Sequence, residues 1–582
     1  MKRRLAKRWK VGRDGAVAAA VAVGIWALLL ATSGGRGLTY DEPVYVAVAA
    51  RNSGWFRHLA ESWRQGRLRE PFSAAVLDRY WHNEGPTQAH RDMHPPVVKL
   101  LSGLTQGLGA AYLGGWAAMR LPAMLLLALT GALLYRLLAA VGSRPAGLFA
   151  ALALLTMPRV FGHAHLLTLD VPVAAMVFLA TALFWKAVTT SSWGWTVAYG
   201  IGFGLALGTK MNALFLPLPL SAWLLWRQWR SRESGGTSPP DARARPSRPG
   251  LALAGKAALG TFLIAPLVFW GTWPWLWYDP VAHLRDYWTY HFRHYAVSVT
   301  YFGRLYAYAP WHYPLVMTLL TTPTALLALV GWWIGSRDWR GRAAGSERRS
   351  EIGVLLALSA VGHLLPFMLP GTPKYNGIRL FMPVFPFLAG LAGLGFQGLS
   401  GWLCRRLEGW AGWSSIAHGP TKLTVLLGMF LLLPGVVGIA RTYPYELSYY
   451  NALVGGLAGA YRRGLEPTYW GETYLSALPF LNAHAPPGAM VYVCPVGVVG
   501  TLLEPYQRLG LLRADLRLTG DEAQARQADF VVFHTHDAEL NATARFLLAH
   551  ARPVHATTLD GVPLLVIYDR TAWAGRGIRH GN

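Results

Sequence analysis

Two adjacent carboxylates, Asp41 and Glu42, follow the first long apolar run of the chain. A carboxylate that faces a partly desolvated cavity at a membrane interface becomes a better proton acceptor, so Asp41 could act as a general base with Glu42 beside it. The same residues would also suit the start of a helix, with Asp41 as the N-cap and Pro43 at the first helical position. Local sequence leaves both interpretations open, and one residue could do both.

Two further motifs contain histidines. Residues 90–96 (HRDMHPP) contain His94 and could bind a metal or position an acceptor, or could form a polar turn before a helix. His163 and His165 precede Asp170, which we expect at the outer end of a membrane span. An ionisable residue in or beside a span is by default a functional hypothesis, and the alternative for Asp170 is an N-cap.

Three cations, Lys210, Lys374 and Arg379, are expected on the same outer side, against the usual bias of basic residues toward the cytoplasm. For any one of them, snorkelling to lipid phosphate is an adequate explanation. Together with Asp41 and Asp170 on one face, they indicate an anionic ligand. A phosphate is the natural candidate, held by charge-assisted hydrogen bonds.

The segment Tyr287–Tyr313 is rich in aromatic side chains and includes His291 and His294. Tyrosine and tryptophan favour membrane interfaces in any case. Aromatic faces also pack against the apolar side of sugar rings. The sequence does not separate these two roles.

The elements that must position these residues are membrane helices. The chain has 582 residues, 53% of them hydrophobic and only 14% charged, against about 25% charged in an ordinary soluble domain. Apolar runs of about 20 residues are long enough to cross a bilayer. Eleven spans are expected, at roughly 15–33, 117–141, 145–160, 171–189, 195–210, 212–226, 251–273, 312–334, 351–370, 379–398 and 422–440.

Three basic stretches orient this bundle. They lie at residues 2–13, 227–250 and 336–350, and with eleven spans all three fall on one side of the membrane. The positive-inside rule makes that side cytoplasmic. We therefore expect a multi-pass protein of the inner (cytoplasmic) membrane, with a cytoplasmic N-terminus and a periplasmic or extracellular C-terminus. The first apolar run could instead be a cleaved signal peptide, but an uncleaved span fits its length better.

Two outer loops, 34–116 and 274–311, and the tail then share the outer side. Amphipathic helices are expected along the interface at 44–57 and 97–111. The tail has short β-type runs at 490–493, 530–533 and 564–568, which indicate a small α/β domain. We divide the chain into a transmembrane domain, 1–440, and a C-terminal soluble α/β domain, 441–582.

Other protein classes are disfavoured. The formal net charge is +25, but many basic residues lie in loops beside apolar helices, which favours membrane orientation over nucleic-acid binding. Cys404 and Cys494 form no C-x-x-C pattern, so neither structural zinc nor a disulfide framework is expected from them. The tail contains no glycine-rich phosphate loop.

In the order of these motifs, the chain resembles the protein O-mannosyltransferase and aminoarabinose-transferase superfamily, the family 39-like glycosyltransferases of the GT-C fold. The resemblance covers about residues 10–440. The matching pieces share one side of the membrane: Asp41-Glu42, His94-Pro95-Pro96, Asp170, Gly208-Thr209-Lys210 and the segment from Lys374 through Arg379 to Pro383.

The resemblance implies an inverting transfer of a hexose or pentose from a polyprenyl-phosphate donor to an acceptor on the outer face. It implies Asp41 as the catalytic carboxylate with Glu42 as its neighbour. Lys374 and Arg379, and less securely Lys210, would hold the lipid phosphate. His94, His163 and Asp170 would position the acceptor or a metal.

The second loop departs from the family in having one Asp with histidines instead of a clear acidic pair. A divalent metal, held by Asp41, His94 and Asp170, is therefore an open expectation, and no nucleotide is expected. The tail does not resemble a β-trefoil, so a lipid, a glycan or a protein could be the acceptor. Its start, residues 449–472, looks like bacterial members of the family. A transporter or lipid flippase, or a non-catalytic assembly protein, are the alternative functions.

Overall fold

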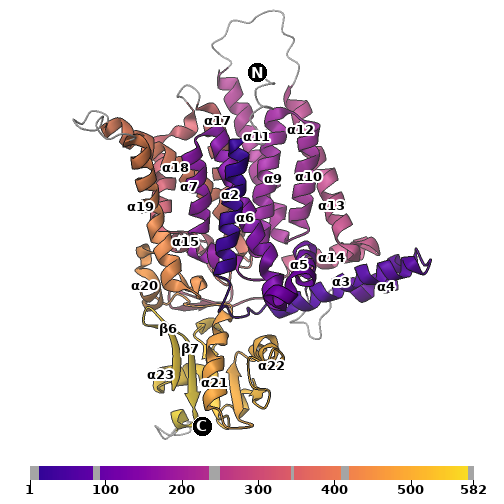
Figure 1. Cartoon of the computed structure of the whole chain (residues 1–582), viewed down its shortest axis with the longest axis vertical. Helices are drawn as coiled ribbons and strands as arrows, with labels where there is room; N and C mark the ends of the chain where they lie inside the picture. Colours follow the sequence, from indigo (N-terminus) through magenta and orange to yellow (C-terminus); the bar gives the residue numbers. More distant parts are fainter. Residues whose placement is uncertain (1–11, 83–91, 235–248, 342–345, 408–418, 574–582) are drawn as a thin grey trace, which may run out of the picture.

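The structure is a computed structural model that describes residues 12–82, 92–234, 249–341, 346–407 and 419–573. A bundle of long helices carries a small α/β domain, the tail, at one end, and helix α2 (Arg13–Ala31) begins at the opposite end (Figure 1). Parts of three expected features lie outside the described residues: most of the basic N-terminal stretch, the connector at 235–248, and His90 and Arg91 of the histidine motif.

The expected spans are helical. Seven helices of the described residues are long and apolar enough to cross a membrane, and two bent pairs raise the number to nine. The single spans are α2, α6 (Gly115–Val141), α9 (Asp170–Thr190), Ala254–Thr272, α17 (Glu347–Met368), α18 (Val384–Leu407) and α19 (Gly419–Thr442). The span Ala254–Thr272 comprises most of α12 (Pro249–Leu259), a π-helical turn and α13 (Ala265–Thr272). The bent pairs are α7 (Arg144–Leu155) with α8 (Pro158–Ala164), and α15 (Tyr313–Thr321) with α16 (Thr324–Ser336).

The two remaining expected spans, 195–210 and 212–226, correspond to α10 (Trp193–Leu207) and α11 (Pro217–Ser234). Helix α10 has only 15 residues, and α11 carries Arg227, Arg230 and Arg232 in its second half. They therefore fall short of the length or composition of an independent span. Of eleven expected spans, nine meet that standard, and two of those nine are bent.

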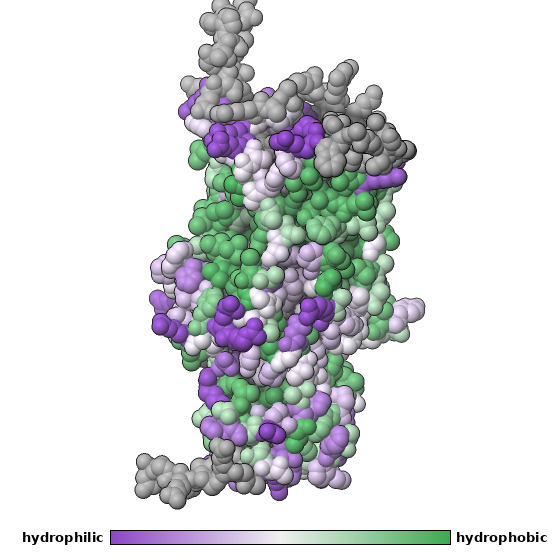
Figure 2. Space-filling view, turned by 90° about the vertical axis from the view of Figure 1, so that its left-hand side faces the viewer, coloured by the Kyte–Doolittle hydropathy of each residue, from purple (hydrophilic) through white to green (hydrophobic). Residues whose placement is uncertain are grey.

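On the face shown in Figure 2 an apolar band crosses the bundle, and hydrophilic side chains gather above and below it. Leu218, Phe262, Val425, Leu426 and Phe430 are among the exposed apolar side chains. Exposed apolar surface of this extent is stable against lipid but not against water. The polytopic helical fold expected from the sequence is thus confirmed.

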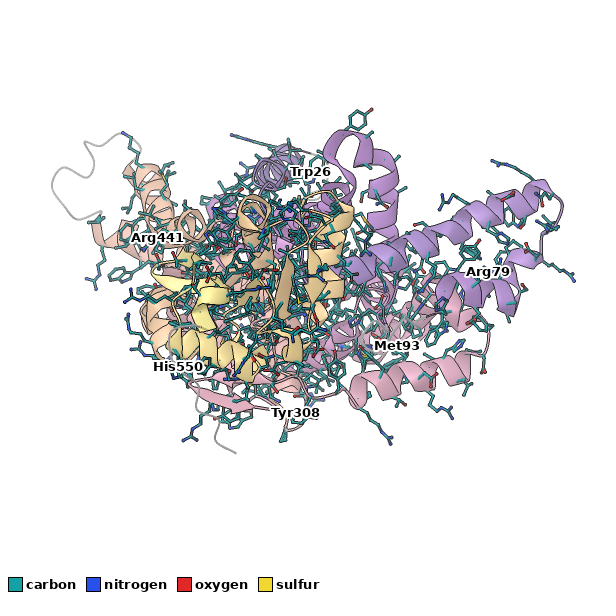
Figure 3. The ribbon with its side chains drawn as sticks, turned by 90° about the horizontal axis from the view of Figure 1, so that it is seen from below. Trp26, Arg79, Met93, Tyr308, Arg441 and His550 are labelled. Atoms are coloured by element: carbon teal, nitrogen blue, oxygen red, sulfur yellow. The ribbon has the colours of Figure 1, made fainter. Side chains whose placement is uncertain are left out.

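Amphipathic helices leave the bundle sideways at the end nearest the tail. Helices α3 (Glu42–Arg64) and α4 (Ala74–Trp81) and, beside them, α14 (Pro280–Phe292) project to one side in Figures 1 and 3. Helices α3 and α5 (Val97–Leu113) occupy the two segments in which interfacial helices were predicted. Between α14 and α15, β1 (Val299–Tyr301) and β2 (Arg304–Tyr306) form a hairpin, which the sequence analysis missed.

The tail is built on a five-stranded sheet of order β4-β3-β5-β7-β6. Strands β3, β4 and β5 are parallel, whereas β7 is antiparallel to both β5 and β6. The strands are β3 (Met490–Cys494), β4 (Arg517–Thr519), β5 (Phe530–His534), β6 (His555–Leu559) and β7 (Val562–Asp569). The three predicted β runs correspond to β3, β5 and β7, and the predicted α/β class is confirmed.

Both faces of this sheet are covered by helices because side chains alternate across a strand. On one face Val491, Val493 and Val532 pack with α21 (Leu478–His484) and α22 (Glu504–Arg508). On the other face Tyr492 and Val531 pack with α23 (Ala542–His550). Helix α20 (Gly456–Arg462) lies in the connection from α19 to the sheet.

Candidate active site

A cavity of about 640 Å³ lies where the sideways helices, the outer end of the bundle and the tail meet. In Figure 3, which looks up from the tail side, the tail covers the middle of this end and Met93 lies beside it. The ionisable side chains that line the cavity are Asp41, Asp92, His94, Lys210, His291, His294, Arg379 and Glu539. Residues far apart in the sequence therefore share one space.

The residues just before Asp41 are fixed to the tail, which places Asp41 at the wall of the cavity. The preceding residue, Tyr40, donates its N–H to Trp470 O at 3.2 Å, and Leu38 N donates to the Tyr506 hydroxyl at 2.6 Å. Asp41 occupies the N-cap position of α3, but its side chain makes no capping hydrogen bond. The carboxylate is instead directed at Arg379 and remains 28% exposed. Asp41 therefore has the N-cap position, but its carboxylate does not cap the helix and is free to contact a ligand in the cavity.

Arg379 joins two acidic groups. Its Nη2 donates to Asp41 Oδ2, and its Nε lies 3.6 Å from Asp170 Oδ2. The guanidinium also stacks on Trp470, with 4.1 Å between its central carbon and the ring centroid. The turn at Asn376-Gly377, where both residues have positive φ, leads the chain into this position. Arg379 is thus fixed by a planar stack and by two carboxylates.

Asp170 is the first residue of α9, and its buried carboxylate accepts a 2.5 Å hydrogen bond from Lys210 Nζ. The N-cap of α9 is Leu169, so the interpretation of Asp170 as an N-cap was wrong. Lys210 follows the turn at Gly208, whose carbonyl accepts the N–H of Val97 at 3.0 Å. A Cβ on Gly208 would lie 2.7 Å from Val97, which explains a glycine at this close approach.

Asp41, Asp170, Lys210 and Arg379 together form what we call the cavity cluster. Two carboxylates face two fixed cations, so the cluster is balanced without any further ion. Asp41, Lys210 and Arg379 line the cavity, and Asp170 supports the two cations from behind. A ligand phosphate that entered the cavity would find both cations at one wall.

Glu42 points away from the cavity. It is fully buried, and its carboxylate accepts two hydrogen bonds from Arg120, at 2.7 and 2.8 Å. The backbone N–H groups of Thr39 and Leu167 donate to the same carboxylate, each at 2.8 Å. Glu42 therefore ties the segment before α3 to the bundle, which is a positioning role distinct from the catalytic role that its adjacency to Asp41 suggested.

Lys374 is also placed differently from the expectation. Its Nζ is bonded to Leu369 O at 3.0 Å and to the carbonyl and hydroxyl of Thr372 at 2.8 and 3.0 Å. These three oxygens of its own loop match the three donors of an ammonium group. Lys374 is buried and, unlike its neighbours Pro373 and Tyr375, does not line the cavity.

The histidines near the cavity lie in a cationic environment. Burial, followed by His291 and Lys210, lowers the pKa of His94 well below its usual range. Burial likewise lowers the pKa of His291 to about 4. Both imidazoles are therefore neutral at pH 7 and can accept or donate a hydrogen bond to a ligand.

His163 does not line the cavity. It is buried behind the cavity cluster, with Nε2 3.2 Å from the Tyr469 hydroxyl and Nδ1 3.9 Å from Asp170 Oδ2. It supports Asp170 from the side and does not reach the cavity, so contact with an acceptor is not available to it in this conformation.

The metal set expected from the sequence, Asp41, His94 and Asp170, is not assembled. The guanidinium of Arg379 lies between the two carboxylates and already supplies positive charge there. Among the described residues, a different set of potential metal ligands lies close together in the tail: His534, His536 and Glu539.

The tail also contributes residues that the sequence analysis missed. The cavity is lined by Trp470 and Glu539 and, around the start of the short helix after β3, by Val496, Gly497, Gly500 and Thr501. Asp92 was missed as a separate candidate, and it pairs with Lys99 and accepts the His94 N–H at 3.0 Å. The pattern His534-Thr535-His536 followed by Glu539 was the sequence signal that could have identified the tail residues.

The fold and the site define a multi-spanning helical membrane protein with a charged cavity at one end of its bundle. Residues 93–235 match the family model described as dolichyl-phosphate-mannose-protein mannosyltransferase. The match extends from Met93 into α11 and includes His94, Asp170 and Lys210. Over these residues the chain has the sequence pattern of a glycosyltransferase family, as its resemblance predicted. No curated protein matches the chain.

Three solved structures are among those that match the chain, each with a TM-score below 0.5. ArnT from Cupriavidus metallidurans bound to undecaprenyl phosphate is 16% identical, with 96% of this chain and 98% of that chain covered and a TM-score of 0.46. The oligosaccharyltransferase of Archaeoglobus fulgidus in the apo form is 12% identical, with 90% and 70% covered and a TM-score of 0.45. The arabinosyltransferase EmbB from Mycobacterium smegmatis is 14% identical, with 79% and 44% covered and a TM-score of 0.38.

Proposed function

We propose that this protein is a membrane glycosyltransferase that moves a sugar from a polyprenyl-phosphate donor to an acceptor hydroxyl. The single observation that carries the proposal is that the carboxylate of Asp41 and the cations Lys210 and Arg379 line one cavity. The family match over residues 93–235 supports the same reaction class. In this proposal the membrane domain, residues 1–440, holds the donor, and the tail, residues 441–582, closes the cavity.

The reaction needs a base and a place for negative charge. As the acceptor oxygen forms its bond to C1 of the sugar, its proton passes to the Asp41 carboxylate. The bond from C1 to the phosphate oxygen breaks on the opposite face of the ring, so the configuration inverts. The departing electron pair stays on the phosphate, where Arg379 and Lys210 stabilise the added charge.

Because Asp41 is paired with Arg379, binding of the donor phosphate would change the state of the catalytic carboxylate. A donor phosphate that binds Arg379 competes with Asp41 for the same guanidinium. Asp41 is then released to accept the acceptor proton only when the donor is in place. Asp170 remains bonded to Lys210 and keeps that cation in position.

The rest of the cavity suits the two parts of the donor. Phe215, Pro366 and Phe367 provide an apolar wall near the ends of bundle helices, which fits an isoprenoid chain. Tyr295 and Tyr375 provide aromatic surface in the loops that line the cavity, which fits a sugar ring. The charges stand at helix ends on the tail side and not at mid-bundle, where a transporter would be expected to carry them.

The orientation is part of the proposal. The tail, the cavity and the sideways helices share one end of the bundle (Figure 1). The basic residues Arg227, Arg230 and Arg340 lie toward the other end, in or after α11 and before α17. By the positive-inside rule the cavity faces the periplasm or the cell exterior, where a lipid, glycan or protein acceptor would meet it.

Transfer can be measured with the full-length protein in nanodiscs, radiolabelled undecaprenyl-phosphate sugars as donors, and bacterial membrane extract as the source of acceptors. Asp41→Asn keeps the shape of the side chain but removes the base, so we expect kcat to fall about 10²–10⁴-fold. Asp14→Asn is the matched control, because Asp14 forms an exposed pair with Arg144 on α2 and α7. Equal rates for Asp41→Asn and the wild type would refute the proposal.

Lys374→Ala tests the phosphate role that the sequence suggested for Lys374. Because its ammonium is bonded to its own loop, we expect the affinity for undecaprenyl phosphate to change less than for Lys210→Ala. A larger loss with Lys374→Ala would return Lys374 to the phosphate site.

A further inference from the structure

The second buried cluster of ionisable groups lies in the tail, beside the cavity but outside the cavity cluster. His534 is the last residue of β5. Glu539 ends the short 3-10 helix Asp537–Glu539, and His536 directly precedes that helix. Both histidines are at most 1% exposed. With Glu466, which contacts His536, they form what we call the tail cluster.

The groups of the tail cluster are close enough together to hold one ion. Glu539 Oε2 is hydrogen-bonded to His534 Nε2 at 3.1 Å and lies 3.4 Å from His536 Nδ1. A tetrahedral metal with bonds of about 2.0–2.1 Å places neighbouring ligand atoms about 3.3 Å apart. The three ligand atoms all lie within 4.8 Å of one another, so a small inward adjustment would complete the set.

The ring of His536 provides an independent observation. It is buried, and neither of its nitrogens makes a hydrogen bond, although a carboxylate oxygen lies near each one. An oxygen that shares a metal with an imidazole lies off the axis of the nitrogen lone pair, where it makes no hydrogen bond to that nitrogen. The unpartnered Nδ1 therefore faces Glu539 in the arrangement expected of two ligands of one ion.

Glu466 completes the arrangement expected around a metal-binding histidine. Its Oε1 lies 3.0 Å from His536 Nε2, the nitrogen away from Glu539. Metal-binding histidines usually turn their second nitrogen to a carboxylate, which fixes the tautomer. Glu466 is itself oriented by the N–H of Thr300, at 2.7 Å, in strand β1.

The carboxylates of Glu466 and Glu539 also favour a bound cation. In the described part of the chain, the ion pairs of Glu466 and Glu539 are with histidines alone, and no lysine or arginine pairs with either. Buried carboxylates are stable only when paired or bound to a metal. Two histidines and a carboxylate are a ligand set that suits zinc.

We propose that His534, His536 and Glu539 bind a divalent transition-metal ion, with zinc as the best chemical match. Tyr40 lies at the open side of this set, with its hydroxyl 2.8 Å from Glu539 Oε2 and 2.9 Å from His534 Nε2. The ion would therefore join the tail to the segment that carries Asp41. It is a clasp between the two domains, and no step of sugar transfer is assigned to it.

The test uses the full-length protein, purified in nanodiscs through a tag without histidines, and measures its metal content by mass spectrometry. We expect about one zinc per chain in the wild type, lost in His536→Ala and in Glu539→Gln. His550→Ala is the matched control, since His550 is exposed on α23 and bonds only to its own helix, and it should retain the metal. Zinc that is absent from the wild type, or retained in both cluster variants, would overturn the proposal.

A second measurement does not depend on variants that fold. Wild-type protein stripped with a chelator should unfold at a lower temperature, and zinc, but not magnesium, should restore the midpoint. Cobalt added to the stripped protein should give visible d–d bands of a tetrahedral site. Glu466→Gln should weaken zinc binding about 10–100-fold without abolishing it. An unchanged midpoint after stripping would show that the cluster is held by protons alone.

The same preparation separates this site from the one expected at the cavity. Asp41→Asn and His94→Ala should keep the metal, because neither residue belongs to the tail cluster. Loss of the metal in these two variants, with retention in His536→Ala, would place the ion at the cavity instead and overturn the assignment to the tail.

Discussion

The cavity cluster and the tail cluster each contain two carboxylates and lie on either side of Tyr40, yet the charges of these carboxylates are balanced in different ways. In the cavity cluster Asp41 and Asp170 face Arg379 and Lys210. In the tail cluster the ion pairs of Glu466 and Glu539 within the described residues are with histidines, not with lysine or arginine. A cluster with permanent cations is complete without an ion and can bind an anion, whereas a cluster of histidines and carboxylates has room for a metal.

The histidines show the same contrast. Burial and neighbouring cations lower the pKa of His94. Burial also acts to lower the pKa of His536, but Glu466 and Glu539 outweigh it and raise that pKa well above the usual range. Histidine is thus favoured in its neutral form at His94, in the cavity, and in its protonated form at His536, in the tail cluster.

The largest effect is expected from Arg379→Gln, which would leave two carboxylates of the cavity cluster without their shared cation. We expect transfer to fall about 10²–10³-fold, because a cation at the leaving phosphate is lost. Breaking a buried pair should also lower the stability by about 3 kcal/mol. Transfer and thermal unfolding in nanodiscs measure both effects.

The control for Arg379→Gln is Arg144→Gln, which breaks an exposed pair with Asp14 and should change neither quantity measurably. If Arg379→Gln retained transfer, the cavity cluster would not be the phosphate site, and the contrast between the two clusters would lose its functional meaning.

An intermediate effect is expected from pH. The folded pKa of His291 is about 4, below its usual 6.5, because the ring is buried. Protons then bind the unfolded chain preferentially, so the protein should lose stability as the pH falls from about 6.5 toward 4 and change little above 6.5. By pH 5 one such histidine accounts for about 2 kcal/mol.

His291→Gln should reduce this acid-induced loss, measured as the unfolding midpoint at pH 7 and pH 5. His555→Gln, in strand β6, is the control and should leave the pH dependence of the wild type intact. Identical pH dependence in His291→Gln and the wild type would show that the cavity histidines are not held neutral.

The smallest effect is expected from Arg441→Ala. Arg441 Nη2 lies 2.9 Å from Asp560 Oδ1 and joins α19 to the turn between β6 and β7, but its side chain is 66% exposed. Exposed pairs contribute about 0–1 kcal/mol. Removal of the pair should therefore shift the unfolding midpoint far less than removal of zinc from the tail cluster; a comparable shift would contradict the clasp.

Sequence reasoning named all four members of the cavity cluster because they stand near the ends of apolar helices. Asp170 and Lys210 follow directly from the span boundaries, and the common side follows from the basic loops. Two residues were assigned to the site because they lie next to site residues in the sequence, and both point elsewhere. Glu42 follows Asp41 but faces Arg120. Lys374 lies five residues before Arg379 but bonds to its own loop. Such choices depend on side-chain direction, which span prediction does not supply.

The contributions of the tail could not be predicted because they depend on docking between distant segments. Nothing in the local sequence of Trp470 shows that Arg379 stacks on its ring. The pair His534 and His536 was readable as a metal motif, but only the fold brings Glu466 and Tyr40 to it. The sheet itself was predictable from its β-type runs, whereas the short strands β4 and β6 were not.

The contact between Tyr40 and Trp470 also sets an order in time. The backbone that carries Asp41 rests on Trp470, and Gly37 lies so close to Glu472 that a Cβ there would be 2.0 Å from its carbonyl oxygen. During synthesis, Asp41 is made more than four hundred residues before Trp470. A nascent chain already inserted in the membrane therefore contains Asp41 before it contains Trp470 and Glu472, and this wall of the cavity cannot assemble until those residues have been synthesised.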